Sequence, residues 1–331
     1  MTSSADARYV ALSGGVGGAK LALGLCDVLA DPARLTVVAN TGDDFEHLGL
    51  KVCPDLDTLT YTLAGLANEE TGWGRAGESG AFMEALGTLG GETWFFLGDK
   101  DLAVHVERTR RLGAGESLSA VTASLCARLG IQARIVPMSD DPVPTVVETA
   151  EGPLAFQHYF VRERCRPTVL GFRYEGAARA RPSAAFLDAL GATDLGAVIV
   201  CPSNPYISID PILAVPGVRD ALGACGAPVI AVSPIIGGQA VKGPTAKMMS
   251  ERGIAPSAAA IAEHYAGLID GFVLDEADRA QATAIAAGGV AVEVTATMMT
   301  ARAEKQALAR AVLDFAGRWN SSGADQSSST A

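Results

Sequence analysis

Short apolar runs that alternate with helical segments most constrain how this chain can fold. Several runs consist almost wholly of Val, Ile, Leu and Ala, which is typical of strands buried on both faces of a parallel sheet. The runs cover residues 9–12, 35–39, 94–97, 133–136, 198–201, 228–232, 271–274 and 290–294. This alternation of strands and helices predicts an α/β fold with a doubly wound, mostly parallel, Rossmann-like sheet.

One large α/β domain is predicted over residues 8–319. Its helices are expected over residues 19–30, 56–67, 80–89, 117–129 and 300–319, and Ser117 is the expected cap of the fourth. The rhythm breaks at about 140–180, where residues 145–148 and 154–161 flank Glu151-Gly152-Pro153 as in a β-hairpin. We expect a small inserted cap there. Residues 320–331 are rich in serine, and we expect a disordered tail.

The composition excludes several classes of protein. Apolar residues make up 49% of the chain, enough for a sizeable core, and the formal net charge of −11 argues against a nucleic-acid partner. The six cysteines form no C-x-x-C pair, so we expect reduced thiols in a cytoplasmic protein. Residues 1–8 are polar, unlike a signal peptide, and no apolar stretch approaches the roughly 18–20 residues of a membrane span.

The first candidate ligand site is a glycine-rich segment. Ligands of a doubly wound sheet bind beyond the carboxyl ends of the strands, and residues 13–20, SGGVGGAK, follow the first predicted strand. Glycines at the start of a helix let backbone N–H groups approach an anion, which predicts a phosphate cradle. The alternative is a tight turn with no ligand. The candidate residues are Ser13, Gly14, Gly15, Gly17, Gly18 and Lys20.

Two acidic turns form the second candidate site. Asp43 and Asp44 directly follow the second predicted strand, and Asp55 and Asp57 lie where the next helix begins. Mg²⁺ takes one or two carboxylates and keeps water and phosphate oxygens as its other ligands. The four aspartates therefore predict a metal site, although Asp55 could instead cap the helix while Asp57 favours its dipole.

Three more turns after predicted strands carry polar side chains. Residues 94–101, WFFLGDKD, place Lys100 either in the site or on the surface, and His47 could line the site or be structural. The segment 201–208, CPSNPYIS, has Asn204 between two prolines. The side-chain amide of Asn204 could bind a base or a ribose, unless the segment is a plain turn. The loop 233–247 suits a phosphorylated ligand, unless it is a mobile surface loop. The last two turns contribute the candidates Ser203, Asn204, Ser233, Gly237, Gly238, Lys242 and Lys247.

Nothing in the sequence recommends a covalent intermediate. Ser13 has no recognisable Ser-His-Asp partners, and no cysteine lies in a nucleophile motif. Phosphate-binding loops beside a carboxylate-held cation instead indicate phosphoryl-group chemistry, in which the protein positions the reactants and neutralises charge.

Seven motifs occur in order along nearly the whole chain. They are GGVGGAK at 14–20, NTGDDFEHLGL at 40–50, CPDLDT at 53–58, LGDKDLA at 97–103, CPSNP at 201–205, SPIIGG at 233–238 and KGPTAK at 242–247. Together they resemble the 2-phospho-L-lactate transferase family from about residue 9 to about residue 300. The pair of acidic turns is the most specific part of this resemblance.

The resemblance implies a reaction of coenzyme F420 biosynthesis. The donor would be a guanylylated phospho-acid that carries a phospholactyl, phosphoenolpyruvyl or phosphoglyceryl group. The ribityl hydroxyl of 7,8-didemethyl-8-hydroxy-5-deazariboflavin (FO) would attack the phosphate that bears the acid, and GMP would leave. Mg²⁺ is the implied cofactor and a homodimer the implied assembly. The implied partners are these small molecules, with no nucleic acid and no membrane.

The same resemblance implies roles for the candidate residues. Asp57 is expected to contact FO and the metal, and Asp44, with Asp43 or Asp55, to complete the metal site. Asp57 and Asp44 are therefore the expected catalytic carboxylates. Lys100 is expected to contact FO, with His47 nearby. The glycine-rich segment, the turn at 203–204 and the loop 233–247 would hold the guanosine diphosphate part.

Two other functions share single features with this chain. Nucleotide-sugar-binding regulatory proteins of a related branch resemble it in the glycine-rich segment, but they are expected to lack the TGDD and PDLDT turns that this chain has at 41–44 and 54–58. The hypothesis of a nicotinamide-dependent oxidoreductase is based on the glycines alone. It is disfavoured because a carboxylate cluster follows the second predicted strand, where such an enzyme has one acidic residue.

Overall fold

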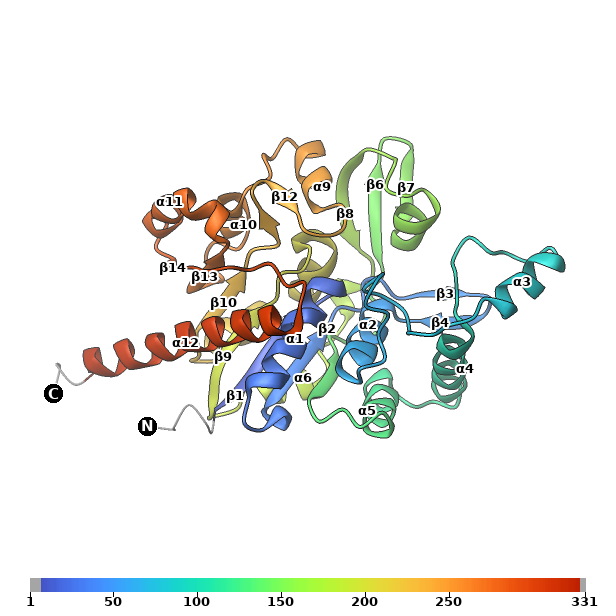
Figure 1. Ribbon diagram of the computed structural model, residues 1–331, viewed down its shortest axis with the longest axis horizontal. Helices are drawn as coiled ribbons and strands as arrows, with labels where there is room; N and C mark the ends of the chain where they lie inside the picture. Colours follow the sequence, from blue (N-terminus) through green and yellow to red (C-terminus); the bar gives the residue numbers. More distant parts are fainter. Residues whose placement is uncertain (1–6, 328–331) are drawn as a thin grey trace.

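A seven-stranded parallel sheet forms the centre of the computed structural model, which describes residues 7–327 (Figure 1). Every pair of neighbouring strands in this sheet is parallel. In spatial order the strands are β14 (Ala291–Val294), β13 (Gly271–Leu274), β10 (Val229–Val232), β9 (Leu195–Val200), β1 (Arg8–Ser13), β2 (Leu35–Ala39) and β5 (Arg134–Pro137). The predicted α/β fold with a parallel sheet is confirmed.

The order of the strands places a switch point between β1 and β9. The chain builds β1, β2 and β5 outward on one side, then returns to the other side of β1 for β9 and continues through β10 and β13 to β14. Doubly wound sheets bind their ligands beyond the carboxyl ends of the strands at such a reversal. The turns after β1, β2 and β9 are therefore the place where a site is expected.

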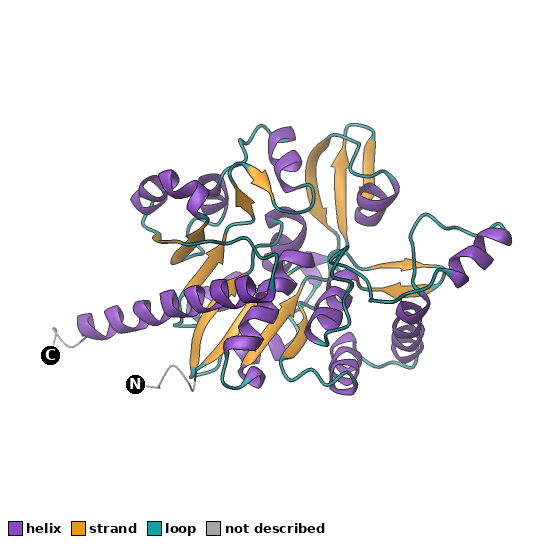
Figure 2. Cartoon of the chain, in the orientation of Figure 1, coloured by secondary structure: helices purple, strands orange, loops and turns teal. Residues whose placement is uncertain are grey.

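Alternate residues of the strands pack into two separate hydrophobic cores, one on each face of the sheet. In β1, Val10 and Leu12 pack on one face of the sheet, and Tyr9 and Ala11 pack on the other, as the two-residue period of a strand requires. The face of Tyr9 is covered by α1 (Gly15–Val28), α2 (Pro54–Leu63), α5 (Leu118–Arg128) and α12 (Arg302–Ser327). The opposite face is covered by α6 (Ala184–Leu190), α7 (Asp210–Leu213), α8 (Val218–Ala224), α9 (Thr245–Glu251), α10 (Ala258–His264) and α11 (Ala282–Ala287) (Figure 2).

Besides one short two-stranded hairpin, two smaller antiparallel units accompany the central sheet. The predicted insert contains a three-stranded sheet of β6 (Thr145–Thr149), β7 (Gly152–Ala155) and β8 (Val169–Tyr174), with β6 in the middle. The hairpin of β3 (Phe45–His47) and β4 (Leu50–Val52) packs with α3 (Ala81–Thr88) and α4 (Asp99–Gly113) in a third, small core (Figure 1). The short elements are η1 (Pro32–Arg34), η2 (His158–Arg162), η3 (Ala177–Arg179), η4 (Pro205–Ile209), β11 (Ile235–Ile236), β12 (Gln239–Ala240) and η5 (Glu276–Gln281).

Several predicted elements differ from the structure. Residues 94–97 form no strand, because Phe95 and Leu97 pack against the β3–β4 hairpin and α3 instead of entering the sheet. The second strand of the predicted hairpin ends at Ala155, and π-helical η2 follows it. The last helix does not end at residue 319 but continues to Ser327, since no proline follows Trp319. Residues 328–331 of the predicted tail lie outside the described residues.

The cysteines and the helices agree with two further expectations. All six cysteines lie within the described residues, and all are free thiols. None of the helices within residues 7–327 combines the length and the apolar composition needed to cross a membrane.

Candidate functional site

The turns after β1 and β9 are joined directly at the switch point. Gly14 N–H donates to Ser203 Oγ at 3.1 Å, and Ser203 Oγ–H donates to the carbonyl oxygen of Gly14 at 2.6 Å. Ser203 thus holds the two turns together from the other half of the chain. Ser203 was predicted to bind a ligand, and in the structure its hydroxyl connects the turns after β1 and β9.

The glycine-rich segment packs against the protein itself. Helix α1 begins at Gly15, so Gly15, Gly17 and Gly18 lie within its first turn rather than in a separate loop. A Cβ at Gly17 would overlap the carbonyl oxygen of Pro202, and one at Gly18 would lie 2.7 Å from Ser203 Oγ. These glycines therefore permit close approach of α1 to the β9 turn, a constraint that would hold without any ligand.

Asn40 joins the two acidic turns. Its side-chain amide donates to Asp43 Oδ1 at 2.9 Å and to Asp55 Oδ2 at 2.8 Å, and its oxygen accepts from Gly42 N–H at 2.7 Å. The other oxygen of Asp55 accepts from Gly15 N–H at the start of α1, at 2.7 Å. Asp55 therefore bridges the β2 turn and the N-terminus of α1, and it does not cap α2, whose N-cap is Cys53.

The Asp43 and Asp55 pair carries more negative charge than its surroundings neutralise. Both side chains are buried, and no ion pair joins either of them within residues 7–327. Burial, followed by the neighbouring Asp55, raises the pKa of Asp43 well above its usual value. Burial raises the pKa of Asp55 to about 7 despite its hydrogen bonds from Asn40 and Gly15. Two buried carboxylates without a cationic partner fit a hard divalent cation such as Mg²⁺.

Buried polar atoms without a partner gather around the same turns. Buried polar groups are normally hydrogen-bonded, so atoms left over within the described residues mark a place for water, an ion or a ligand. Four of these atoms lie at the end of β1, in the turn after β2 or at the start of β6, whose Thr145 N–H donates to the Gly42 carbonyl at 2.8 Å. They are Ser13 Oγ, Thr41 Oγ1, Asp44 Oδ1 and Thr145 Oγ1.

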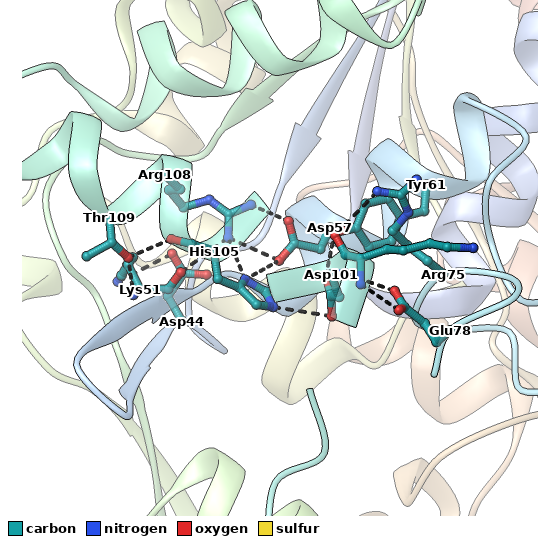
Figure 3. Close-up of polar contacts among 11 residues, drawn as sticks. Asp44, Lys51, Asp57, Tyr61, Arg75, Glu78, Asp101, His105, Arg108 and Thr109 are labelled. Atoms are coloured by element: carbon teal, nitrogen blue, oxygen red, sulfur yellow. Dashed lines mark hydrogen bonds and ion pairs between the residues drawn. The ribbon is translucent and has the colours of Figure 1, made fainter. Parts of the chain in front are cut away.

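Asp57 belongs to a separate network, in which it forms a buried ion pair with Arg108 (Figure 3). Both of its oxygens accept from the guanidinium of Arg108 on α4, one of them from Nη1 at 3.1 Å. His105 Nδ1 lies 3.7 Å from Asp57 Oδ2, and its Nε2 lies 3.2 Å from Asp101 Oδ2. Tyr61 O–H donates to the other oxygen of Asp101. Burial opposes the charge of Arg108, but Asp57 raises the pKa of its guanidinium above the usual value.

This second network fits a cation less well than the first. Ligand atoms of Asp57, Asp101 and His105 lie within 4.8 Å of one another, which is suitable for a metal ion. However, the Arg108 guanidinium already occupies both oxygens of Asp57 and would repel a cation. Asp44 lies between the two networks: burial raises its pKa to about 6, and its nearest cation is Lys51 Nζ at 3.5 Å.

Lys20 on α1 is close enough to two lysines from distant parts of the chain, Lys242 and Lys305, to be affected by their charges. Lys20 Nζ donates to the carbonyl oxygen of Met299 at 2.8 Å, and burial, Lys305 and Lys242 together lower its pKa. Lys242 donates to the carbonyl oxygen of Thr71. This concentration of positive charge in an acidic protein suits an anionic ligand at the N-terminus of α1.

Other predicted ligand residues are held by contacts within the protein. Lys247 pairs with Glu251 at 2.5 Å, and Asn204 Oδ1 accepts from Tyr206 N–H at 2.9 Å. Ser233 Oγ donates to the Ile235 carbonyl at 2.9 Å. Gly237 and Gly238 form the turn of the β11–β12 hairpin, where their positive φ of 56° and 76° favours glycine.

The two candidates for the FO side lie in different settings. Lys100 is exposed at the start of α4, and its Nζ donates to the carbonyl oxygen of Gly77 at 2.6 Å. His47 is buried in an aromatic cluster, with ring centroids 5.1 Å from Trp94 and 5.8 Å from Phe95. The structure does not bring these two residues into contact with the Asp43 and Asp55 pair.

The sequence reasoning missed the partners on α4. Asp101, His105 and Arg108 follow the spacing i, i+4 and i+7, which places them on one face of a helix. The segment 99–113 was not predicted as a helix, although two charged residues and a histidine at this spacing could have indicated one. Asn40, which hydrogen-bonds to both acidic turns, lies in the NTGDD motif, but it was assigned no role from the sequence.

Comparison with known proteins identifies the family. Residues 9–312 match the family described as 2-phospho-L-lactate transferase CofD. The chain is 44% identical over 315 residues to the phosphoenolpyruvate transferase of Streptomyces griseus, covering 93% of this chain and 98% of that protein. It is 38% identical over 330 residues to the phosphoenolpyruvate transferase of Mycolicibacterium smegmatis, covering 94% and 99%.

A solved structure supports the fold alone. Protein BH3568 of Bacillus halodurans superimposes with a TM-score of 0.57 over 88% of this chain and 93% of that one, at 14% identity. The family match runs from β1 into α12 and includes all seven sequence motifs, which lie between residues 14 and 247. The chain therefore belongs to the 2-phospho-L-lactate transferase CofD family and is a phospho-acid transferase.

Proposed function

We propose that this protein transfers a phospho-acid group to the ribityl hydroxyl of FO in F420 biosynthesis, with a guanosine diphosphate-linked donor and Mg²⁺. The observation that carries the proposal is the Asp43 and Asp55 pair, bridged by Asn40 beside the N-terminus of α1. Within residues 7–327 no cationic side chain pairs with either carboxylate, and the start of α1, with Lys20 and Lys242 nearby, adjoins the pair. A donor diphosphate with its cation needs both features.

The division of labour follows from the contacts of each side chain. Asp43 and Asp55 would hold Mg²⁺, which would neutralise the charge of the donor phosphates. The N-terminus of α1 with Lys20 and Lys242 would hold the diphosphate. Asp44 would accept the hydroxyl proton, because its Oδ1 is without a partner among the described residues. Asp57 would instead orient the acceptor side of the site through its fixed pair with Arg108.

The proposed reaction is a single displacement at phosphorus. The ribityl oxygen forms a bond to the phosphorus that bears the acid, and the bond from that phosphorus to the bridging oxygen of GMP breaks. The hydroxyl proton passes to a carboxylate, and GMP leaves with the bridging oxygen as part of its phosphate. No oxidant or reductant is needed.

We propose phosphoenolpyruvate as the acid. The support is that several relatives between 37% and 44% identical carry the name phosphoenolpyruvate transferase. The candidate acids differ by only a methyl, a methylene or a hydroxymethyl group, a difference worth about 1–3 kcal/mol in a binding pocket. Preference should therefore be measured by direct competition between donors.

The test is a reconstitution with purified components. The protein is incubated with FO, Mg²⁺ and an equimolar mixture of the three guanylylated donors, and the products are identified by mass. We expect the phosphoenolpyruvyl product to dominate and its formation to stop in excess chelator. A dominant product from another acid would refute the donor assignment. Product at the full rate in chelator would refute the metal assignment.

A further inference from the structure

An ordered loop beside the site exposes a tryptophan side chain. The loop 66–79 links α2 to α3 and is tied by its own backbone, with Ala76 N–H to the Leu66 carbonyl at 2.8 Å and Asn68 N–H to the Gly74 carbonyl at 3.0 Å. Trp73 at its tip is 52% exposed, and it lies between Gly72 and Gly74, whose φ angles are 76° and 71°. A large indole left in water on a well-tied loop is available for a partner.

One side of this loop lies against the predicted nucleotide region. Thr71 accepts a hydrogen bond from Lys242, whose charge also acts on Lys20. A Cβ at Gly72 would lie 2.7 Å from Lys242 Nζ and 2.9 Å from Val16 Cγ1, in the first turn of α1. The backbone next to Trp73 therefore packs directly on the helix N-terminus proposed to hold the diphosphate.

The other side of the loop lies against the predicted acceptor region. Lys100 Nζ donates to the Gly77 carbonyl at 2.6 Å, and Glu78 accepts from the N–H groups of Lys100 and Asp101 at 2.7 and 2.8 Å. Arg75 lies over the Tyr61 ring, 5.5 Å from its centroid, beside the Asp57 network (Figure 3). The loop thus spans the two regions that the proposed reaction must bring together.

We propose that the loop 66–79 is a wall shared by both regions and that the Trp73 indole stacks on a planar heteroaromatic ring of a bound substrate. The proposal rests on the proposed function, which requires two such rings, the guanine of the donor and the deazaflavin of the acceptor. Stacking needs only an exposed aromatic face at the rim of the site and no hydrogen-bond partner. Trp319, which is 39% exposed on α12, is a matched tryptophan on another element.

The experiment measures the dissociation constants of GDP and FO separately by calorimetry. The proteins are the wild type, Trp73→Leu, Trp73→Phe and the control Trp319→Leu. We expect Trp73→Leu to weaken one ligand roughly five-fold or more, Trp73→Phe to restore most of that affinity, and Trp319→Leu to change neither ligand. The ligand that weakens identifies the ring. In turnover assays, Trp73→Leu should raise KM for that substrate more than it lowers kcat.

The outcomes separate this inference from the proposed function. If the wild type binds neither GDP nor FO, the proposed function fails. If the wild type binds both and Trp73→Leu keeps both affinities within about two-fold, the stacking role is wrong. If Trp73→Phe loses as much affinity as Trp73→Leu for both ligands, the role is also wrong, because an aromatic ring should stack in either form. Thermal unfolding of each variant verifies that the loop change leaves the fold intact.

Discussion

At the scale of single residues, the four aspartates of the acidic turns are not equivalent. Asp43 and Asp55 share the Asn40 amide and form no ion pair with any residue that the structure describes, whereas Asp57 is bound on both oxygens by Arg108. A sequence motif cannot distinguish these settings, because Arg108 lies 51 positions from Asp57 along the chain. The difference predicts that the same substitution, aspartate to asparagine, affects metal use at residue 55 and the stability of the fold at residue 57.

Asp55→Asn should impair metal use without unfolding the protein. The amide keeps an oxygen for the Gly15 N–H, but its NH2 group no longer accepts from Asn40, and the pair loses one of its two negative charges. We expect the Mg²⁺ concentration for half-maximal turnover to rise roughly 10- to 100-fold. The measurement is a Mg²⁺ titration of turnover, with Asp314→Asn on the exposed surface of α12 as the control. An unchanged Mg²⁺ requirement in Asp55→Asn would place the metal elsewhere.

Asp57→Asn should instead destabilise the fold. It leaves the Arg108 charge buried without its partner, and breaking a buried ion pair in this way costs about 3–5 kcal/mol. The double variant Asp57→Asn with Arg108→Gln removes both charges, and we expect it to unfold at a higher urea concentration than Asp57→Asn alone. Equal stability of the two variants would contradict the pairing. Loss of turnover in Asp57→Asn therefore does not by itself identify a metal ligand.

At the scale of elements, the sequence predicted the central sheet well because its strands are apolar on both faces. All seven strands of that sheet fall within or beside predicted runs, and β2 and β13 match to the residue. Residues 94–97 are equally apolar, but they bury their side chains against the β3–β4 hairpin, which local periodicity cannot reveal. Likewise, the rule that ligands bind beyond the carboxyl ends of strands directed attention to the turns after β1, β2 and β9, but it could not show which of their side chains are already held by contacts within the protein.

The glycines of α1 have a packing role that the sequence alone did not predict. Gly17→Ala should destabilise the protein by about 1–3 kcal/mol, because the added Cβ overlaps the Pro202 carbonyl and must push α1 away from the β9 turn. Gly223→Ala in α8 is the matched control: its Cβ meets open space, and we expect a gain of up to about 1 kcal/mol. Urea unfolding of both variants tests this difference. Destabilisation in both would argue against a specific contact at Gly17.

At the scale of the whole molecule, two helices from opposite ends of the sequence, α1 and α12, pack together beside the proposed site. Helix α12 packs on α1 so closely that a Cβ at Gly24 would overlap the Lys305 carbonyl. Lys20 reaches the Met299 carbonyl just before α12, and Lys242 arrives from the second half of the sheet. The proposed anion site therefore requires β1 to α1, the loop 241–244 and α12 to be in place together.

This assembly predicts that a bound anion stabilises the whole fold. The three lysines repel one another, and a diphosphate would neutralise them, so GDP at about 100 times its dissociation constant should add about 2.7 kcal/mol to the free energy of unfolding. Lys20→Gln should weaken GDP binding and reduce this stabilisation. Lys247→Gln removes the same charge from a pair with Glu251 and should leave GDP affinity within about two-fold of the wild type. The measurements are thermal unfolding with and without GDP and calorimetric titration. If Lys247→Gln weakened GDP binding as much as Lys20→Gln, the effect would come from net charge rather than from a site that joins both ends of the chain.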